Sequence, residues 1–316
     1  MGRFINPFTD YGFKKIFGQE ISKDLLIDFL NDLLKGERVI TDLTFLNNEQ
    51  LPEWEDARAL IYDIHCTTDT GEKIIVEMQN KSQAYFRERA LFYLSHAVTR
   101  QGQRGDWMFD IKAVYGVFFM NFLLKDNVKL RTDIILADRE TGQLFSDKMR
   151  PIFIALPVFD KEEEKCENDF ERWIYVLKNM ETLKRMPFKA RKAVFEKLEE
   201  IADVSSLNEE ENELYWRSVN AYRTHLSVLE ASRLEGREEG REEGREEGRE
   251  EGREEGREEG RAEGREEGRE EGRAEGREEG SIEKCFSIAR NLKQLGTSVD
   301  LISKATGLTP EEIAGL

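Results

Sequence analysis

Apolar positions in the first 160 residues follow two different spacings, which predict alternating helices and strands. Apolar residues recur every three or four positions over 22–35 and again over 84–101, which is typical of amphipathic helices. Runs rich in β-branched and aromatic residues predict strands within 38–51, 59–66, 73–78, 111–123, 128–136 and 152–159. Pro157 indicates that the last of these is an edge strand. The order of elements predicts an α/β fold with a mixed sheet flanked by helices.

Two of the predicted strands form a hairpin, LIYDIHCTTDTGEKIIVEMQN (60–80), with Asp63 on the first strand and Glu77 on the second. A two-residue turn would place these carboxylates on opposite faces, whereas a three-residue turn at 69–71 would pair them on one face. Gly71 favours the longer turn, because the last position of that turn is left-handed. We therefore expect two carboxylates with Cβ atoms about 5 Å apart. Such a pair shares a proton or holds a cation, unless both side chains simply lie on a wet sheet face.

The segments on either side of the hairpin supply further polar candidates. Residues 4–18 combine aromatic residues with Asp10 and Lys14, and they form either a cap on the core or part of a site beside the hairpin carboxylates. Between residues 81 and 104 the basic residues outnumber the acidic ones, with Lys81, Arg87, Arg89, Arg100 and Arg104 against Glu88. This basic segment is either merely solvated or binds phosphates, because salt screening makes the local field more important than the net charge.

From residue 161 the pattern becomes helical and then repetitive. Apolar stripes within 161–232 predict a helical extension of several packed helices. Residues 233–280 form 12 tetrads, RLEG once, RAEG twice and REEG nine times. A period of four drifts by about 40° per tetrad around a helix, and each glycine costs about 1 kcal/mol relative to alanine. We therefore expect a semi-flexible acidic spacer that is marginal as an isolated helix in solution.

Residues 281–316 predict a small helical tail. Ile282, Phe286 and Leu292 lie on one apolar stripe, and the following LISKATGLTPEEIAGL has the spacing of a helix-turn-helix. Thr309 and Glu312 have the spacing of a capping box. The second helix would present acidic side chains and no Arg or Lys, so packing or self-association is favoured over DNA recognition.

Composition limits the compartment and the partners of the protein. The net charge of −17 argues at first against a nucleic-acid partner, but the 12 Arg and 21 Glu of the repeat account for −9 of it. The three cysteines are odd in number and far apart, which favours a reducing compartment over disulfides or a zinc site. No run of about 18 apolar residues occurs, and the first residues contain no apolar signal core. We therefore expect a cytoplasmic protein with no membrane partner.

Several short segments give the chain a resemblance to a known family. They are FTDYGFKKIFG, YDIHC, VEMQNK and RERALFYLSHAVTRQ, together with the tetrad repeat and the helical tail. On these residues the chain resembles the Rpn family of recombination-promoting nucleases, also described as transposases, within the PD-(D/E)xK nuclease superfamily. The resemblance is least clear over 160–232. It implies a PD-(D/E)xK restriction-endonuclease-like core over residues 1–160.

The resemblance also implies roles for individual residues. Asp63 and Glu77 would ligate a divalent metal with help from the backbone carbonyl of Met78, and Asp10 is a further catalytic candidate. Gln79 takes the place of the superfamily lysine, and its uncharged amide limits it to positioning by hydrogen bonds. Oxygen ligands suit Mg²⁺, with Mn²⁺ or Ca²⁺ as alternatives. The candidate contacts to DNA phosphates are Lys14, Lys81, Arg87, Arg89 and Arg100.

Two functions remain open at this point. The first is a metal-dependent DNA endonuclease that hydrolyses phosphodiester bonds in recombination, mobile-element biology or defence, in a bacterial cytoplasm. The second is a catalytically inactive nuclease-like scaffold that oligomerises through its repeat and tail. The uncharged Gln79 and the acidic net charge favour the second slightly. We expect a homo-oligomer.

Overall fold

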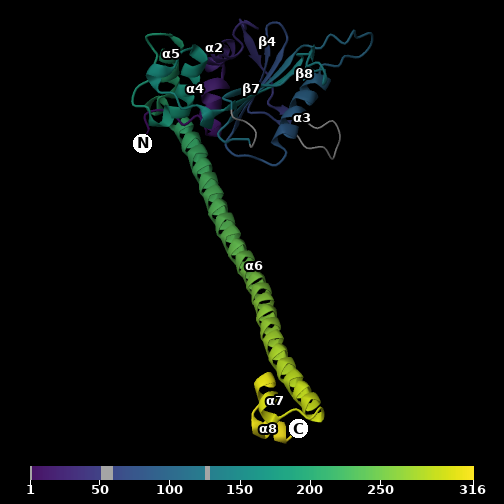
Figure 1. Ribbon diagram of the computed structural model, residues 1–316. Helices are drawn as coiled ribbons and strands as arrows, with labels where there is room; N and C mark the ends of the chain where they lie inside the picture. The colour runs from purple at the N-terminus through teal and green to yellow at the C-terminus, as the bar shows by residue number, and fades with distance from the viewer. Residues whose placement is uncertain (1, 51–59, 125–128) are drawn as a thin grey trace. The chain divides into compact units, whose positions relative to one another are not determined.

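The structure is a computed structural model that describes residues 2–50, 60–124 and 129–316 (Figure 1). It divides into two compact units, Met1–Val228 and Leu229–Leu316. Two of the predicted strands begin at residues 59 and 128, and both of these residues lie outside the described part of the chain. Across the described parts of the chain, no helix has the combination of length and apolarity that crossing a membrane requires.

A mixed six-stranded sheet forms the centre of the first unit, in the order β1-β4-β5-β6-β10-β7. Its strands are β1 (Leu43–Phe45), β4 (Ile64–Thr68), β5 (Lys73–Gln79), β6 (Val114–Met120), β7 (Arg131–Asp133) and β10 (Met149–Ala155). Strands β5, β6 and β10 are parallel, and the other pairings are antiparallel. Two short ladders pair β2 (Glu49–Gln50) with β3 (Leu60–Ile61) and β8 (Leu136–Ala137) with β9 (Leu144–Ser146). The mixed α/β fold predicted from the sequence is thereby confirmed.

Helices cover both faces of this sheet (Figure 1). One face packs against α1 (Asp10–Phe17), α2 (Lys23–Leu33), α4 (Asp169–Asn179) and α5 (Val194–Ala202). The other face packs against α3 (Phe86–Thr99), the crossover between the parallel strands β5 and β6. Short 3₁₀ turns are η1 (Glu20–Ser22), η2 (Leu156–Val158), η3 (Glu163–Lys165), η4 (Met180–Thr182) and η5 (Val204–Ser206).

The larger core joins the sheet to helices from both ends of the first unit. Phe119 of β6 lies 5.2 Å from Phe29 of α2, measured between ring centroids, and Trp173 of α4 lies 5.7 Å from Phe17. The indole Nε1 of Trp173 also donates to Asp28 of α2 at 2.8 Å. The helices expected as an extension over 161–232 therefore share one core with the sheet as far as residue 228.

The edge-strand prediction for 152–159 is wrong. Strand β10 lies between β6 and β7, inside the sheet. Pro157 falls in η2, after the strand has ended, so its missing N–H removes no ladder hydrogen bond. The β8–β9 ladder was not predicted, because its strands are too short and too exposed to show a clear alternation.

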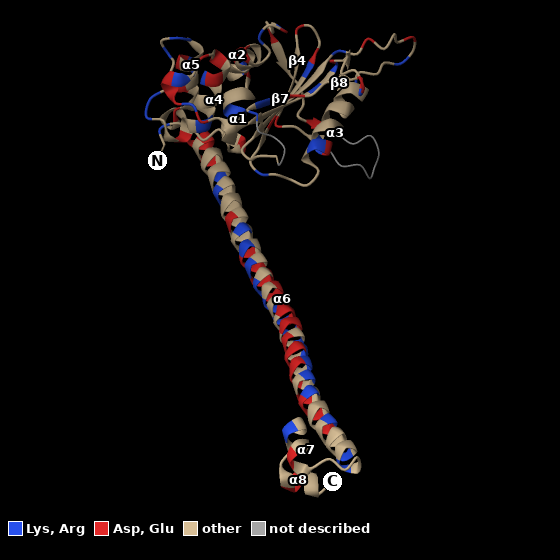
Figure 2. Cartoon of the chain, in the orientation of Figure 1, with Lys and Arg blue, Asp and Glu red and all other residues tan. Residues whose placement is uncertain are grey.

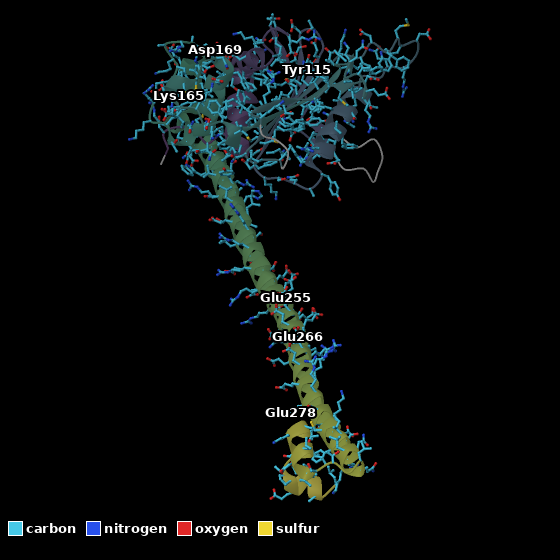
Figure 3. The ribbon with its side chains drawn as sticks, viewed as in Figure 1. Tyr115, Lys165, Asp169, Glu255, Glu266 and Glu278 are labelled. Carbon is cyan, nitrogen blue, oxygen red and sulfur yellow. The ribbon has the colours of Figure 1, made fainter. Side chains whose placement is uncertain are left out.

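The long helix α6 (Glu209–Gln294) begins in the first unit and contains the entire tetrad repeat. Basic and acidic residues follow one another along it (Figure 2), and the labelled Glu255, Glu266 and Glu278 project from its surface (Figure 3). This unbroken helix differs from the semi-flexible spacer that we expected. Glu and Arg three residues apart favour a helix, whereas the glycine of each tetrad opposes one. Its marginal stability as an isolated segment stays a prediction.

The tail packs the end of α6 against α7 (Val299–Thr306) and α8 (Pro310–Ala314). Ala289, Ile302, Leu308 and Ile313 form its small core. The capping box is confirmed: Thr309 accepts from the backbone N–H of Glu312, and the Glu312 side chain accepts from the backbone N–H of Thr309.

Candidate active site

The turn between β4 and β5 has the length that brings the two hairpin carboxylates together. Ile64 pairs with Val76, and the N–H of Thr68 donates to the carbonyl of Glu72 at 2.9 Å. The loop therefore contains three residues and ends at Gly71, whose φ of +95° lies in the region that favours glycine. One pair beyond Ile64–Val76, this register places Asp63 opposite Glu77. The predicted register is confirmed.

Asp63 and Glu77 hold each other through backbone hydrogen bonds. The N–H of Asp63 donates to Oε1 of Glu77 at 3.2 Å. The N–H of Met78 donates to Oδ2 of Asp63 at 2.8 Å. Each carboxylate is therefore fixed by the opposite strand, where the strands part at the end of β5.

The β4–β5 ladder begins at Ile64, so Asp63 is not part of it. Asn48, in the loop before β2, binds the main chain on both sides of this point. Its side-chain Nδ2 donates to the carbonyl of Asp63 at 2.9 Å, and its Oδ1 accepts from the N–H of His65 at 3.0 Å. Its backbone carbonyl accepts from the N–H of Tyr62 at 3.0 Å. In a regular ladder, Tyr62 would donate to the carbonyl of Met78. The N–H of Tyr62 instead donates to the Asn48 carbonyl, so it is not available to the carbonyl of Met78.

Burial makes the carboxylate pair electrostatically unfavourable without a cation. Glu77 is 1% exposed, and this burial together with the Asp63 charge raises the pKa of Glu77 to about 8. Burial also raises the pKa of Asp63, whereas the hydrogen bond from Met78 and the charge of Lys14 oppose the rise. Two neighbouring acids that both have raised pKa values are a signature of functional sites.

Gln79 and Arg89 both approach the same oxygen of Glu77. The Gln79 amide donates from Nε2 to Oε2 of Glu77 at 3.1 Å, and Nη2 of Arg89 lies 4.0 Å from the same Oε2. Arg89 comes from the second turn of α3, and it also donates to Tyr93 at 2.9 Å and to Gln83 at 2.8 Å.

The N-terminal candidates lie on α1, across the sheet from α3. Lys14 pairs with Asp10 at 2.7 Å, and the charges of both act on the pKa of Asp63. The side chain of Asn80 ties the end of β5 to the same segment by donating to the carbonyl of Phe8 at 2.7 Å. The structure thus brings α1 toward the carboxylate pair, although Asp10 itself is an exposed residue.

The remaining basic candidates are placed around the start and the end of α3. Arg87 is exposed, and Lys81 lies half-buried in the loop before α3. Nη1 of Arg100 donates to the side-chain oxygen of Gln50 on β2 at 3.0 Å. Their contact with DNA phosphates stays a prediction.

Sequence reasoning missed Asn48, Gln83 and Tyr93. Gln83 and Tyr93 have no motif of their own, and only the docking of α3 brings them to Arg89. Asn48 lies fifteen residues before Asp63, and the only signal in the sequence is an Asn-Asn pair next to a predicted strand end.

The oxygen donors around Asp63 suit a hard divalent cation. They are two carboxylates and the carbonyl of Met78, which points to the same strand edge as the Met78 N–H that binds Asp63. Few protein ligands and several retained waters are typical of Mg²⁺ sites. No group of three or more His, Cys, Asp or Glu side chains suited to a metal occurs in the part of the chain that the structure describes. Oxygen donors of this kind fit a hard divalent cation, whereas structural zinc sites use Cys and His ligands.

Residues 7–232 match the family described as PD-(D/E)XK nuclease family transposase. The chain belongs to this family. No curated protein and no solved structure matches the chain. In this PD-(D/E)XK nuclease family member, the match covers the sheet and the helices on both of its faces, and it ends one residue before the first tetrad of the repeat. The resemblance inferred from the sequence motifs is confirmed.

Proposed function

We propose that the protein is a metal-dependent DNA endonuclease that acts in recombination or in the movement of genetic elements. The observation that carries this proposal is the pairing of half-buried Asp63 with buried Glu77 inside a core that belongs to a nuclease family. Hydrolysis of a phosphodiester adds the oxygen of water to phosphorus and breaks one P–O ester bond. The products are a phosphate monoester and an alcohol, so no further reactant is needed.

The proposed roles follow from the contacts of the residues. A divalent cation, when bound, supplies positive charge to the phosphate and lowers the pKa of a water. Asp63, Glu77 and the carbonyl of Met78 would hold that cation. Gln79 fixes one oxygen of Glu77 and thereby its orientation. Lys14 would bind an adjacent phosphate, because it lies near enough to Asp63 for its charge to lower the pKa of that carboxyl.

Plasmid nicking tests the proposal. Supercoiled DNA is incubated with the full chain and Mg²⁺, Mn²⁺ or EDTA, and open-circular product is measured on gels. We expect cleavage with either metal, none with EDTA, and loss of cleavage in Asp63→Ala and Glu77→Ala. Glu140→Ala, an exposed acid in the β8–β9 turn, is the matched control and should cleave normally. Full cleavage by both site variants would overturn the site assignment.

A second candidate function is an oligomeric scaffold, which the apolar surface of the tail favours. Ile282, Val299 and Leu301 are exposed on the small helical unit, at 51%, 44% and 62%. We propose that this surface joins copies of the chain. Light scattering of the full chain and of a chain ending at residue 280 tests the idea. A truncated chain that forms an oligomer with the same number of subunits as the full chain would exclude the tail.

A further inference from the structure

Two side chains from different elements meet at one oxygen of Glu77. Gln79 reaches Oε2 along β5, and Arg89 reaches it from α3. Gln79 occupies the position where the superfamily has a lysine, and its amide provides no charge. The guanidinium of Arg89 is therefore a cation next to the place where the ammonium of that lysine would be.

Arg89 is held from two sides. Its Nε donates to the Tyr93 hydroxyl at 2.9 Å, and its Nη1 donates to Oε1 of Gln83 at 2.8 Å. The Tyr93 ring also lies under the guanidinium, with its centroid 5.0 Å from Cζ. These contacts fix the planar group with Nη2 directed toward Glu77. A fixed guanidinium loses little conformational entropy when it binds an anion.

The direction and exposure of Arg89 suit an incoming anion. Nη2 lies 4.0 Å from Oε2 of Glu77, which is beyond hydrogen-bond distance. The hydrogen bonds that Arg89 donates within the described residues come from Nε and Nη1. The side chain of Arg89 is 37% exposed while that of Glu77 is 2% exposed, so the guanidinium is the solvent-accessible member of this pair. An anion that approaches the carboxylate pair from solvent would meet Nη2.

We propose that Arg89 supplies to the scissile phosphate the positive charge that Gln79 cannot supply, and that Gln83 and Tyr93 position it for this role. The inference rests on the proposed nuclease function. A guanidinium has N–H donors and no acceptor, so the proposed role is that of a hydrogen-bond donor and not of a base. It donates from Nη2 to a non-bridging phosphate oxygen, whose negative charge grows as the P–O ester bond breaks. Arg89 thus differs from a distant phosphate clamp, which improves binding without accelerating the reaction.

The test separates the rate of cleavage from the affinity for DNA. Single-turnover nicking is measured with Mg²⁺, and binding of a fluorescein-labelled duplex is measured by anisotropy in EDTA. Arg89→Gln should lower the rate by about 100-fold, as expected for the loss of one charge-stabilising donor. Its Kd for the duplex should remain within threefold of the wild-type value. Arg139→Gln, an exposed arginine in the β8–β9 turn, should change neither quantity.

The decisive variant places the positive charge on β5 at residue 79 and removes it from α3 at residue 89. The double variant Gln79→Lys with Arg89→Gln should cleave at least tenfold faster than Arg89→Gln alone, because lysine at 79 restores a cation beside Oε2 of Glu77. Tyr93→Phe keeps the ring and removes the hydroxyl that accepts from Arg89, so it should give an intermediate rate. Thermal unfolding of each variant shows that it is folded. If Arg89→Gln does not fold, Tyr93→Phe and Arg89→Lys carry the test with the same two measurements.

The outcomes distinguish this inference from the proposed function. A wild-type protein that cleaves no DNA with any divalent metal overturns the nuclease proposal itself. A wild-type protein that cleaves while Arg89→Gln cleaves within threefold of it overturns the role of Arg89 alone. A fall in affinity that matches the fall in rate also overturns it, since Arg89 would then be an ordinary binding residue. So does a double variant that is folded and remains as slow as Arg89→Gln.

Discussion

The backbone N–H of Asp63 donates to the side chain of Glu77, so the orientation of one acid depends on the strand that carries the other. In the other direction, the backbone N–H of Met78 donates to the carboxylate of Asp63. A change in the register of this hairpin would therefore separate both carboxylates at once.

Removing the metal should make stability fall as the pH rises. The pKa of Glu77 is about 8 in the folded protein and 4.5 for the free side chain. The folded state therefore binds more protons than the unfolded state between these values, and the stabilisation present at low pH is lost as the pH rises through 8. Calorimetry in EDTA should give a lower Tm at pH 8.5 than at pH 6. Glu77→Gln should flatten this part of the profile, and a wild-type Tm that rises over the interval would contradict the prediction.

Added Mg²⁺ should raise the Tm more at pH 8 than at pH 6. At the lower pH a proton on the carboxylate pair competes with the cation, because metal ligands must be deprotonated. Binding to the folded state alone stabilises the protein by mass action. A magnesium titration followed by thermal unfolding checks this, with Asp63→Asn as the variant that loses the shift. Equal shifts in that variant would place the bound ion elsewhere.

Asn48→Ala should weaken both the fold and the site. The change leaves the carbonyl of Asp63 and the N–H of His65 without their partner, at a cost of about 1–3 kcal/mol for a buried polar group. It also frees Asp63 from its bent position, so cleavage should fall by more than the loss of folded protein explains. Urea unfolding and nicking of the same preparations give both numbers. Asn47→Ala, one position earlier, is a comparison variant that leaves the contacts of Asn48 intact.

Gly116→Ala should disturb the packing of α3 on the sheet. A Cβ at this position of β6 would lie 2.5 Å from Cδ1 of Leu94 and 2.7 Å from the ring of Phe118. Both neighbours are buried, so the overpacking should cost about 1–3 kcal/mol. Because α3 also carries Arg89, the rate of cleavage should fall as well. Gly240→Ala in the repeat has open space around the new Cβ and is the control.

The isolated repeat should be only partly helical. A peptide of residues 233–280 lacks the elements that flank it in α6, and glycine at every fourth position disfavours the helix. Far-UV circular dichroism should show weak helicity that increases when four glycines are replaced by alanine. A fully helical wild-type peptide at 25 °C would show that charge pairs outweigh the glycines.

The sequence was sufficient for the main layers and for the carboxylate pair, because both follow from local rules. The alternation along the hairpin and the position of Gly71 determine the register without any distant contact. The convergence of Gln79 and Arg89 was not predictable in this way, since it depends on how the crossover helix packs on β6. The position of β10 was also missed, because a proline just after a strand resembles a proline within it when only the sequence is known.

The contacts of Asn48 have a consequence for the evolution of the family. A single amide side chain bridges the carbonyl of Asp63 and the N–H of His65, and so helps to set the direction of Asp63. The residues at positions 48 and 63 should therefore covary among members of the family. Family members that have lost the aspartate are free to lose the asparagine, and members that keep the aspartate should retain an amide or an equivalent pair of hydrogen-bonding groups at position 48.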